Sequence, residues 1–448
     1  WYRLVKIMNG TLKRAEYCRS YLHTRNKAKG KVFYEELLKL REKLDNVLKP
    51  AMKINLPEAR VSNFCRYSLI RAMITRIGDH PKYGVSDRSL FPYDGSEHDG
   101  FPDTFTSSTS CLLEWGLFEV ARKYLDNYLT EFVEEDGSID YRGPETGQYG
   151  KMLSIFARYY EYAKDYTLLL KNIEKIRGIE NLLLSLREKS KKLPPNDPAY
   201  GMISGWSEAD SWPSERYNQP YFSNSTEACR GFYDLGNVWL KIGRELSKPE
   251  LINRGKELVR EAEELKRDIL ASVQKSTISK RDFTYIPPIA GVKKPYDEDI
   301  REDPHSPQQY ATRAYCEMLE SGILPTSVID AIMKYNSTHG GSVLNIGSIG
   351  GGRRAECKVI STFLAHGYAY GLIQSDKIRE IILLYYALMA HCHTRGTWTA
   401  FEYQVINRAG KRTFSPYCLP AQLSIPILTK WMLVFEDPTL PVLRLGWA

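Results

Sequence analysis

The sequence of 448 residues has no run of about 18 uncharged apolar residues, so it predicts no helix that spans a membrane. It has eight cysteines, all single, and the lack of a CxxC pair argues against a zinc knuckle. Most of these cysteines lie in apolar helical patterns and are expected to be buried. The sequence also lacks a large excess of charge of one sign, because its 62 basic residues are nearly balanced by 54 acidic ones. The small net charge of +8 does not favour a nucleic-acid partner.

Motifs for metals and nucleotides are weak. The glycine-rich stretch 340–352 (GGSVLNIGSIGGG) lacks GxxxxGKS/T and follows no predicted strand, so it is not a phosphate-binding loop. The side chains of EHD (97–99) could not easily bind one ion, because neighbouring residues of an extended segment point to opposite sides. His391 and His393 come at the end of a predicted helix, and only a strand would place both rings on one side. We therefore expect no metal site and no cofactor, although the acid-rich loop 83–105 could hold calcium.

Helical periodicity, by contrast, runs from end to end, with apolar residues at three- and four-residue spacing. Strand signals are few, long loops follow every second helix, and no repeat of fixed period supports a superhelical array. This alternation predicts an all-α fold, an (α/α)6 toroid with long loops over one mouth. We expect residues 1–448 to form this single domain, excised from a longer chain because it starts without Met. The predicted helices occupy 3–23, 32–49, 57–78, 109–133, 148–190 (two helices), 224–246, 249–273, 308–322, 325–336, 354–374, 375–392 and 420–437.

Two of the long loops carry candidate sugar contacts. Loop 83–105 places Asp94 and Asp99 among aromatic rings. Carboxylates accept hydrogen bonds from hydroxyl groups, and aromatic faces pack on the C–H surfaces of sugars. Loop 134–148 holds Arg142 and Glu145 in a turn shaped by glycine and proline. These two side chains are expected either to pair with each other or to contact substrate.

A third loop opens with GMISGWSEADSW (201–212), in which Glu208 and Asp210 lie between Trp206 and Trp212. Loops fixed by a scaffold commonly display functional groups. Glu227, after the possible N-cap residues 224–226, is instead expected to cap the next helix or to interact with its dipole.

Glu402 is the corresponding candidate late in the chain, as the single carboxylate of the aromatic segment TWTAFEY. An apolar setting of this kind suits a catalytic carboxyl group. Glycoside hydrolysis needs two carboxyl groups that face the scissile bond, one to protonate the leaving oxygen and one to activate water or attack carbon. Glu402 and either Glu208 or Asp210 are therefore predicted to face each other across the barrel mouth.

Several segments resemble the six-hairpin glycosidase superfamily, which includes rhamnosidase, glucoamylase and trehalase-like families. They are FVEEDGSIDYRGPETGQYG, YGMISGWSEADSW with YFSN, AHGYAYGLIQ, and RGTWTAFEY followed by SPYCLPAQLSIPILTKWMLVFEDP, and the resemblance runs from about residue 57 onward. It implies an (α/α)6 barrel and a glycosidase that inverts configuration on a carbohydrate substrate. It also implies a general acid at Glu208 or Asp210, a base at Glu402, and an upstream β-sandwich domain in a longer chain.

The leading hypothesis adds further substrate-binding residues to this pair. The expected polar contacts and aromatic walls are Asp94, Asp99, Arg142, Glu145, Trp206, Trp212, Tyr221, His366, Tyr368 and Trp398. His366 lies in a predicted helix rich in small residues, and a buried histidine with a purely structural role is the alternative.

Two other hypotheses stay open. A polysaccharide lyase or sugar epimerase on the same barrel would abstract a proton with residues from the set His366, Tyr368, His391, His393 and Arg395. A non-catalytic carbohydrate-binding toroid would have no activity to lose when Glu402 is replaced by Gln.

Overall fold

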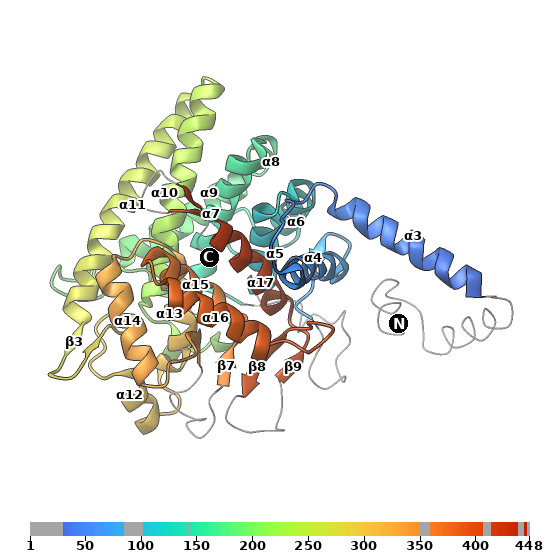
Figure 1. The fold of residues 1–448 in the computed structure, drawn as a ribbon. Helices are drawn as coiled ribbons and strands as arrows, with labels where there is room; N and C mark the ends of the chain where they lie inside the picture. The colour runs from blue at the N-terminus through green and yellow to red at the C-terminus, as the bar shows by residue number, and fades with distance from the viewer. Residues whose placement is uncertain are drawn as a thin grey trace.

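The computed structural model describes residues 30–84, 102–141, 143–348, 359–405, 414–437 and 443–445. The predicted helix 3–23 and the predicted contacts Asp94, Asp99 and Arg142 lie outside these residues. The backbone of Asp210 is described, but its side chain is not. Figure 1 shows a body built almost entirely of helices, from which α3 (Gly30–Leu48) projects to one side.

Six inner helices form a closed ring in the described part of the chain. Each packs on the next, and the last packs on the first. In order they are α5 (Pro102–Glu114), α7 (Thr146–Ala163), α10 (Phe222–Glu245), α13 (Ala311–Glu320), α15 (Ala365–Gln374) and α17 (Leu419–Leu433).

Outer helices alternate with the inner ones along the sequence. They are α4 (Ala59–Ile74), α6 (Phe118–Glu131), α9 (Ile173–Ser190), α11 (Pro249–Ser276), α14 (Thr326–Thr338) and α16 (Ile378–His391). The long pair α10 and α11 packs side by side and extends beyond the rest of the body in Figure 1. Six inner and six outer helices in the described chain make the (α/α)6 toroid, which confirms the predicted fold class.

Burial separates the two rings. Every residue from Leu419 to Met432 of α17 is buried, and so is every residue of α5. A helix buried on all sides lies inside the fold, whereas an outer helix buries one stripe. The inner helices also approach closely, because a Cβ on Gly150 of α7 would lie 2.3 Å from the backbone nitrogen of Ala228 in α10. Small residues therefore set the spacing of the ring.

The strands are short and lie outside the helices, in the connecting segments and after α17. The three-stranded antiparallel sheet β7 (Val359–Ser361), β8 (Phe401–Val405) and β9 (Phe414–Pro416) has β8 in the centre and pairs Ser361 with Tyr403. The two-stranded ribbons are β1 (Arg76–Ile77) with β2 (His80–Pro81), β3 (Ile278–Ser279) with β4 (Thr284–Tyr285), β5 (Ser342–Val343) with β6 (Ile346–Gly347), and β10 (Val434–Glu436) with β11 (Leu443–Leu445). Short helices in the connections are α8 (Thr167–Lys171), α12 (Tyr296–Glu302), η2 (Ala209–Ser211), η3 (Glu215–Tyr217) and η4 (Pro307–Tyr310).

Some predicted helix boundaries are wrong. The segment 109–133 is not one helix, because α5 ends at Glu114 and Gly116 takes a left-handed φ of +77° before α6 begins. In the described part of segment 354–374, Val359–Ser361 form strand β7 and the helix begins at Ala365. Helix α17 ends at Leu433, and β10 begins at Val434. Residues 224–226 lie inside α10 and not at its N-cap, which is Tyr221.

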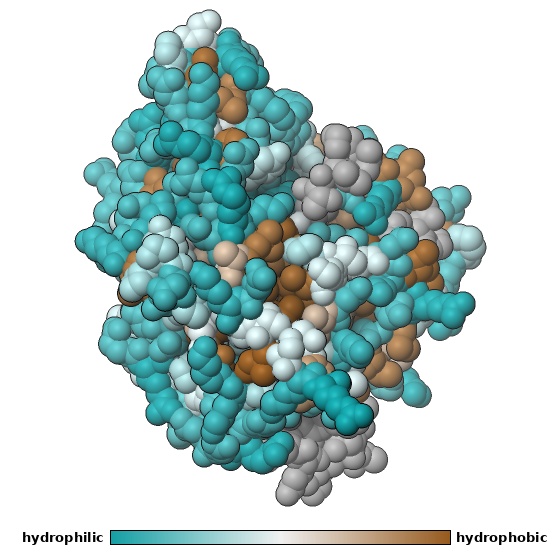
Figure 2. Space-filling model, turned by 90° about the vertical axis from the view of Figure 1, so that its left-hand side faces the viewer, coloured by the Kyte–Doolittle hydropathy of each residue, from teal (hydrophilic) through white to brown (hydrophobic). Residues whose placement is uncertain are grey.

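One face of the molecule shows how hydrophilic and apolar side chains are distributed. The face shown in Figure 2 is mostly hydrophilic, with apolar side chains gathered near its middle. The six cysteines that the structure describes are all buried, as expected, and they carry free thiols. None of the described helices combines the length and the apolar character needed to cross a membrane.

Candidate active site

The N-terminal ends of inner helices gather polar side chains at one mouth of the barrel. Asp103 lies in the first turn of α5, Glu145 is the N-cap residue of α7, and Arg313 lies in the first turn of α13. Carboxylates are stabilised near helix N-termini, where backbone N–H groups have no partner within the helix. The loop after Gly201 joins them, since Glu208 reaches the same arginine.

Arg313 is the centre of this cluster and is almost fully buried. Its guanidinium lies 2.7 Å from Asp103, 3.4 Å from Glu145, 3.7 Å from Glu208 and 3.6 Å from Glu317. One positive charge thus faces four carboxyl groups. Carboxyl groups held this close cannot all be ionised at low cost, so the cluster is expected to retain protons near neutral pH.

Glu145 supports the loop that carries Glu208. One carboxyl oxygen accepts a hydrogen bond of 3.1 Å from the backbone N–H of Ala209, and the other lies against Arg313. Burial raises the pKa of Glu145 well above its ordinary value, and the negative charges of Asp103 and Glu208 add to this, while Arg313 opposes it. Glu145 pairs with Arg313, whereas Arg142, its partner in one of the two predicted alternatives, lies outside the described residues. With 2% of its surface exposed, Glu145 is better placed to position the loop than to contact a sugar.

Glu317 lies one helical turn below Arg313 on the inner face of α13. Burial raises its pKa to about 7, against the opposing effect of the Arg313 charge. Gln148 of α7 donates a hydrogen bond of 3.4 Å to its carboxyl group. Glu317 is therefore partly protonated at neutral pH.

Glu402 lies on the central strand β8, where backbone pairing on both sides fixes its position. The phenol of Tyr83 donates a hydrogen bond of 2.7 Å to one oxygen of Glu402. Tyr83 is itself held by the first residue of α17, because its carbonyl oxygen accepts the N–H of Leu419. A donated hydrogen bond favours the ionised form of a carboxyl group, so this contact suits a carboxylate that acts as a base.

Tyr403 connects Glu402 with the Arg313 cluster. Burial raises the pKa of its phenol well above the usual range, the charges of Glu402 and Glu208 raise it further, and Arg313 opposes the shift. The ring of Phe363 lies between, with its centroid 5.7 Å from the Arg313 guanidinium and 5.6 Å from that of Tyr403. The charges of Glu402 and Glu208 thus both raise the pKa of one buried phenol, although the two residues are far apart in the sequence.

The expected aromatic walls differ in exposure. Trp212 is 49% exposed, and Trp206 is half-buried with its indole N–H donated to the carbonyl oxygen of Ser214. Tyr221 is fully buried beside Glu208, whose charge helps to raise the pKa of its phenol after burial and two neighbouring tyrosines. Trp398 packs edge-on against Phe64 of α4. Trp206 and Trp212 are therefore the two of these rings that the loop presents beside Glu208.

His366 and Tyr368 lie in the interior of the barrel. Burial lowers the pKa of His366 to about 4, opposed by the nearby Glu320 carboxylate, so its imidazole is neutral. The Tyr368 hydroxyl receives a hydrogen bond of 2.8 Å from Asn336 and donates one to the carbonyl oxygen of Gly341. These contacts favour a structural role for Tyr368.

The residues of the lyase or epimerase alternative do not share one environment. His391 and Arg395 are exposed, whereas His393 is buried against Phe64, with a ring distance of 4.8 Å. Burial lowers the pKa of His393 to about 4. Within the described ranges, no three His, Cys, Asp or Glu side chains form a group that could hold a metal ion.

Two central residues were missed in the sequence. Arg313 and Glu317 stand four apart in ATRAYCEMLE, and Lys151 pairs with Glu320 at 2.7 Å farther along the axis. Charged side chains at helical spacing usually mark a solvated face, so the pattern alone does not reveal a buried one. Glu227 was also misread, because it is buried in the barrel beside Lys151, and burial raises its pKa well above the ordinary value.

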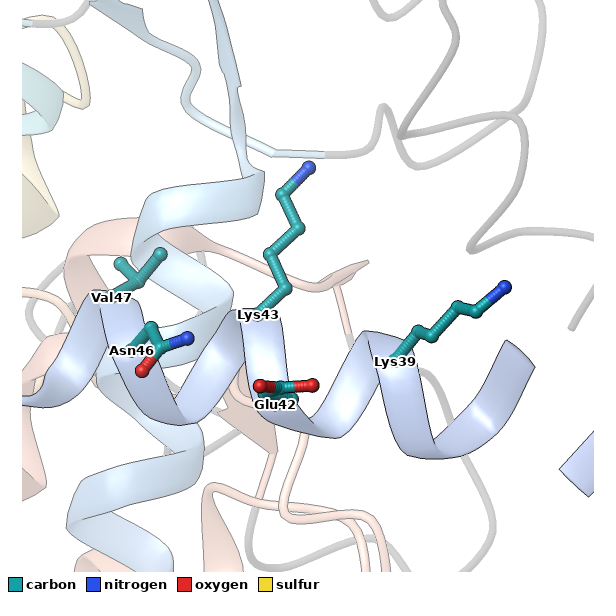
Figure 3. Close-up of a pocket in the computed structure, with 5 residues that line it drawn as sticks. All are labelled: Lys39, Glu42, Lys43, Asn46 and Val47. Carbon is teal, nitrogen blue, oxygen red and sulfur yellow. The ribbon is translucent and has the colours of Figure 1, made fainter. Parts of the chain in front are cut away.

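A second candidate, a depression along α3, lacks comparable features. Figure 3 shows its five described lining residues, Lys39, Glu42, Lys43, Asn46 and Val47, which follow that one helix. No aromatic ring is among these five, and their charged groups extend into solvent. The barrel mouth remains the better candidate.

Comparison with known proteins supports the architecture. Neither the family models nor the curated proteins give a match to this sequence. Among solved structures, a wild-type glycosidase superposes with a TM-score of 0.53 and 12% identity over 84% of this chain and 98% of its own. A bacterial glucoamylase complexed with acarbose gives 0.59 and 11% over 94% and 61%, and a rhamnosidase from Klebsiella oxytoca with rhamnose bound gives 0.50 and 12% over 86% and 65%.

This chain spans less than two thirds of the glucoamylase and rhamnosidase chains. Identities of this size establish a common fold and leave the chemistry to be argued from the site. The chain has the fold of the six-hairpin glycosidases, an (α/α)6 toroid.

Proposed function

We propose that the protein is a glycoside hydrolase in which Glu402 activates water and Glu208 protonates the leaving oxygen. The observation that carries the proposal is a chain of contacts at the barrel mouth. Glu208 lies 3.7 Å from Arg313, whose guanidinium lies 5.7 Å from the centroid of the Phe363 ring. That ring lies 5.6 Å from the ring of Tyr403, the neighbour of Glu402 in β8. Two carboxyl groups from distant segments at one mouth of the barrel are what glycoside hydrolysis requires. The glycosidase fold of the solved neighbours supports the same reaction class.

Glu402 suits the role of base. The hydrogen bond from Tyr83 favours its ionised form, and a carboxylate must be ionised to take a proton from water. Strand pairing on both sides of β8 limits its movement during the reaction.

Glu208 suits the role of acid because of its neighbours. It shares Arg313 with three other carboxyl groups, and of these Glu145 and Glu317 have raised pKa values. A general acid must hold a proton at the working pH, and a cluster short of positive charge helps to keep one. The loop is also fixed, since the Glu208 carbonyl oxygen accepts the N–H of Ser211 at 3.0 Å. Asp210, two residues on, is the other candidate acid.

The substrate we propose is the end of a glycan or an oligosaccharide, bound beside Trp206 and Trp212. Indole faces pack on sugar rings, and the charged groups around Arg313 can bind hydroxyl groups. With water activated by a base on the opposite side from the acid, hydrolysis inverts the anomeric configuration.

The test is the rate of sugar release from a panel of aryl glycosides and oligosaccharides of glucose, rhamnose and glucuronic acid. Glu402→Gln and Glu208→Gln should each lower kcat by about 10²–10⁴-fold, the usual contribution of a general acid or base. The matched control is Glu215→Gln, which removes an exposed carboxylate from the same loop and should change kcat little.

Three results would count against the proposal. Full activity in Glu402→Gln would show that Glu402 is not the base. If the parent protein released no sugar from any glycoside in the panel, the assignment as a glycoside hydrolase would be contradicted. Full activity in Glu208→Gln together with a large loss in Asp210→Asn would move the acid to Asp210.

A further inference from the structure

A cavity lies at the end of the barrel opposite to Arg313. It has a volume of about 330 Å³ and is bordered by Glu114, the last residue of α5, and by Lys430, in the last turn of α17. Asp103, at the barrel mouth that holds the Arg313 cluster, lies at the other end of α5. Eleven residues of helix separate Asp103 from Glu114, which corresponds to about 16 Å along the axis. The two sites are therefore distinct.

Charged side chains line this cavity as pairs. Arg158 lies 3.4 Å from Glu114, and Arg230 lies 2.6 Å from Asp234. Lys430 pairs with Glu114 as well and lies 3.1 Å from Glu436. Lys241 pairs with Glu161 in the same lining. The positive and negative charges among the described lining residues are equal in number, so the cavity has no net charge to attract an ion.

Both kinds of hydrogen-bonding group are nevertheless present. Arg158 uses one of its guanidinium nitrogens on Glu114, and Arg230 uses two, on Asp234 and on the carbonyl oxygen of Ser321. A guanidinium has five donors, so each arginine has further donors for a ligand. Asn237 donates its amide N–H to the carbonyl oxygen of Tyr233, which leaves an amide oxygen to accept.

Aromatic rings complete the lining. Tyr233 is 49% exposed at the cavity, and the Tyr162 hydroxyl donates to Glu436 at 2.5 Å. Trp431 is buried below them, with its indole N–H donated to Glu114 at 3.2 Å. Paired charges beside aromatic faces are typical of sites that bind hydroxyl-rich ligands by both edge and face.

We propose that this cavity binds a neutral sugar of one or two rings, at a site separate from the active mouth. Its volume lies at the lower end of the range of about 300–1,000 Å³ for small-molecule sites. A neutral polyol can use the spare donors and the carboxylate acceptors together. An anionic sugar or a phosphate would be attracted by the positive member of each ion pair and repelled by the negative member. The proposal does not depend on whether Glu402 is catalytic.

The test is calorimetric titration of Glu402→Gln, which binds without turnover, with glucose, rhamnose, maltose and cellobiose, followed by a crystal structure with the sugar that binds best. We expect one sugar in the far cavity. Tyr233→Ala should weaken that binding about tenfold, the effect of losing roughly 1.4 kcal/mol of stacking. Glycoside hydrolysis by an otherwise unchanged Tyr233→Ala enzyme should stay the same.

Tyr386→Ala is the matched control, because Tyr386 is also 49% exposed but lies on α16, away from the cavity. It should change neither binding nor hydrolysis. The proposal is overturned if none of the four sugars occupies the far cavity, or if Tyr233→Ala binds as tightly as its parent. Tighter binding of glucuronate or inorganic phosphate than of every neutral sugar would also overturn it.

Discussion

At the scale of single residues, Arg313 determines the electrostatics of the barrel mouth. A buried guanidinium surrounded by Asp103, Glu145, Glu208 and Glu317 neutralises one charge of four. Burial raises the pKa values of Glu145 and Glu317, and the negative charge of Asp103 raises both further, while Arg313 opposes the shift. In the proposed mechanism this cluster supplies a proton on one side, and Glu402, which accepts a hydrogen bond from Tyr83, takes one from water on the other.

Tyr83→Phe tests the support of the base. The change removes the 2.7 Å hydrogen bond to Glu402 and keeps the ring. Since a hydrogen bond to a charged group contributes about 1.5–3 kcal/mol, kcat/KM should fall by about 10–100-fold. The carboxylate form becomes less favourable, so the acidic limb of the pH–rate profile should move to higher pH.

Tyr386→Phe is the control for this change, because the Tyr386 hydroxyl also donates to a glutamate, Glu58, but at the surface and at 3.1 Å. It should leave the pH–rate profile unchanged. An unchanged profile in Tyr83→Phe itself would show that Glu402 does not depend on Tyr83.

Glu317→Gln tests the pH dependence of stability. The pKa of Glu317 is about 7 in the folded protein and near its ordinary value of 4.5 in the unfolded chain. The folded state then binds more protons between these values, so stability is fully present below about pH 4.5 and is lost as pH rises through 7. The shift corresponds to about 3 kcal/mol.

In Glu317→Gln this loss should disappear. The free energy of unfolding, measured by urea titration at pH 5 and pH 8, should differ by about 2.5 kcal/mol less in the variant than in the parent. An equal difference in both proteins would contradict the assigned pKa.

At the scale of elements, the contacts between helices set where the site residues lie. α7 and α10 approach through Gly150, where a Cβ would lie 2.3 Å from the backbone of Ala228. Because backbone cannot give way as a side chain can, Gly150→Ala should destabilise the protein by about 1–3 kcal/mol or more in thermal or urea unfolding.

The control is Gly371→Ala in α15, where the nearest atom to an added Cβ is a side-chain methyl of Leu319 at 3.0 Å. That methyl can move, and alanine is favoured over glycine in a helix by about 1 kcal/mol. A loss in Gly371→Ala as large as in Gly150→Ala would mean that backbone contact is not what limits the approach.

Arg187 of α9 joins two outer helices to the loop that leads to Glu208. It is fully buried, pairs with Glu261 and lies 2.8 Å from Asp268 of α11, and it donates to the carbonyl oxygen of Gly201 at 2.9 Å. Removing one partner of a buried ion pair leaves the others uncompensated. Arg187→Met should therefore cost about 3–5 kcal/mol of stability.

Arg177→Met, in the same helix, is the matched control. Arg177 pairs with Glu174 at 3.3 Å on the surface, and such pairs contribute about 0–1 kcal/mol. Similar losses for the two variants in urea unfolding would contradict the assigned role of Arg187.

At the scale of the whole molecule, periodicity predicted the outer helices well and the inner ones less well. α11 is clear from sequence because Leu251, Leu258 and Leu265 repeat at helical spacing on one buried stripe. α5 is not, because its sequence PDTFTSSTSCLLE has the composition of a loop, and only the closed ring explains why its hydroxyl groups are buried. Strand β7 was hidden inside a helical pattern because its partner, β8, lies far along the chain.

The candidate site was predicted in part for the same reason. Glu208 and Glu402 were identifiable because each stands among aromatic residues on a long loop segment. Arg313 was not, because three of the carboxyl groups around it, those of Asp103, Glu145 and Glu208, come from other segments that only the closed barrel brings together. The fourth, Glu317, lies one turn away in the same helix. Glu145 was identified as a candidate site residue, but its ion-pair partner, Arg313, was not.

The measurement that tests the central claim most directly is the anomeric configuration of the first sugar released, followed by proton NMR as hydrolysis begins. If Glu402 activates water and Glu208 protonates the leaving oxygen, the first product should have the configuration opposite to that of the substrate. A first product with retained configuration would show a covalent intermediate and contradict this assignment of the two carboxyl groups.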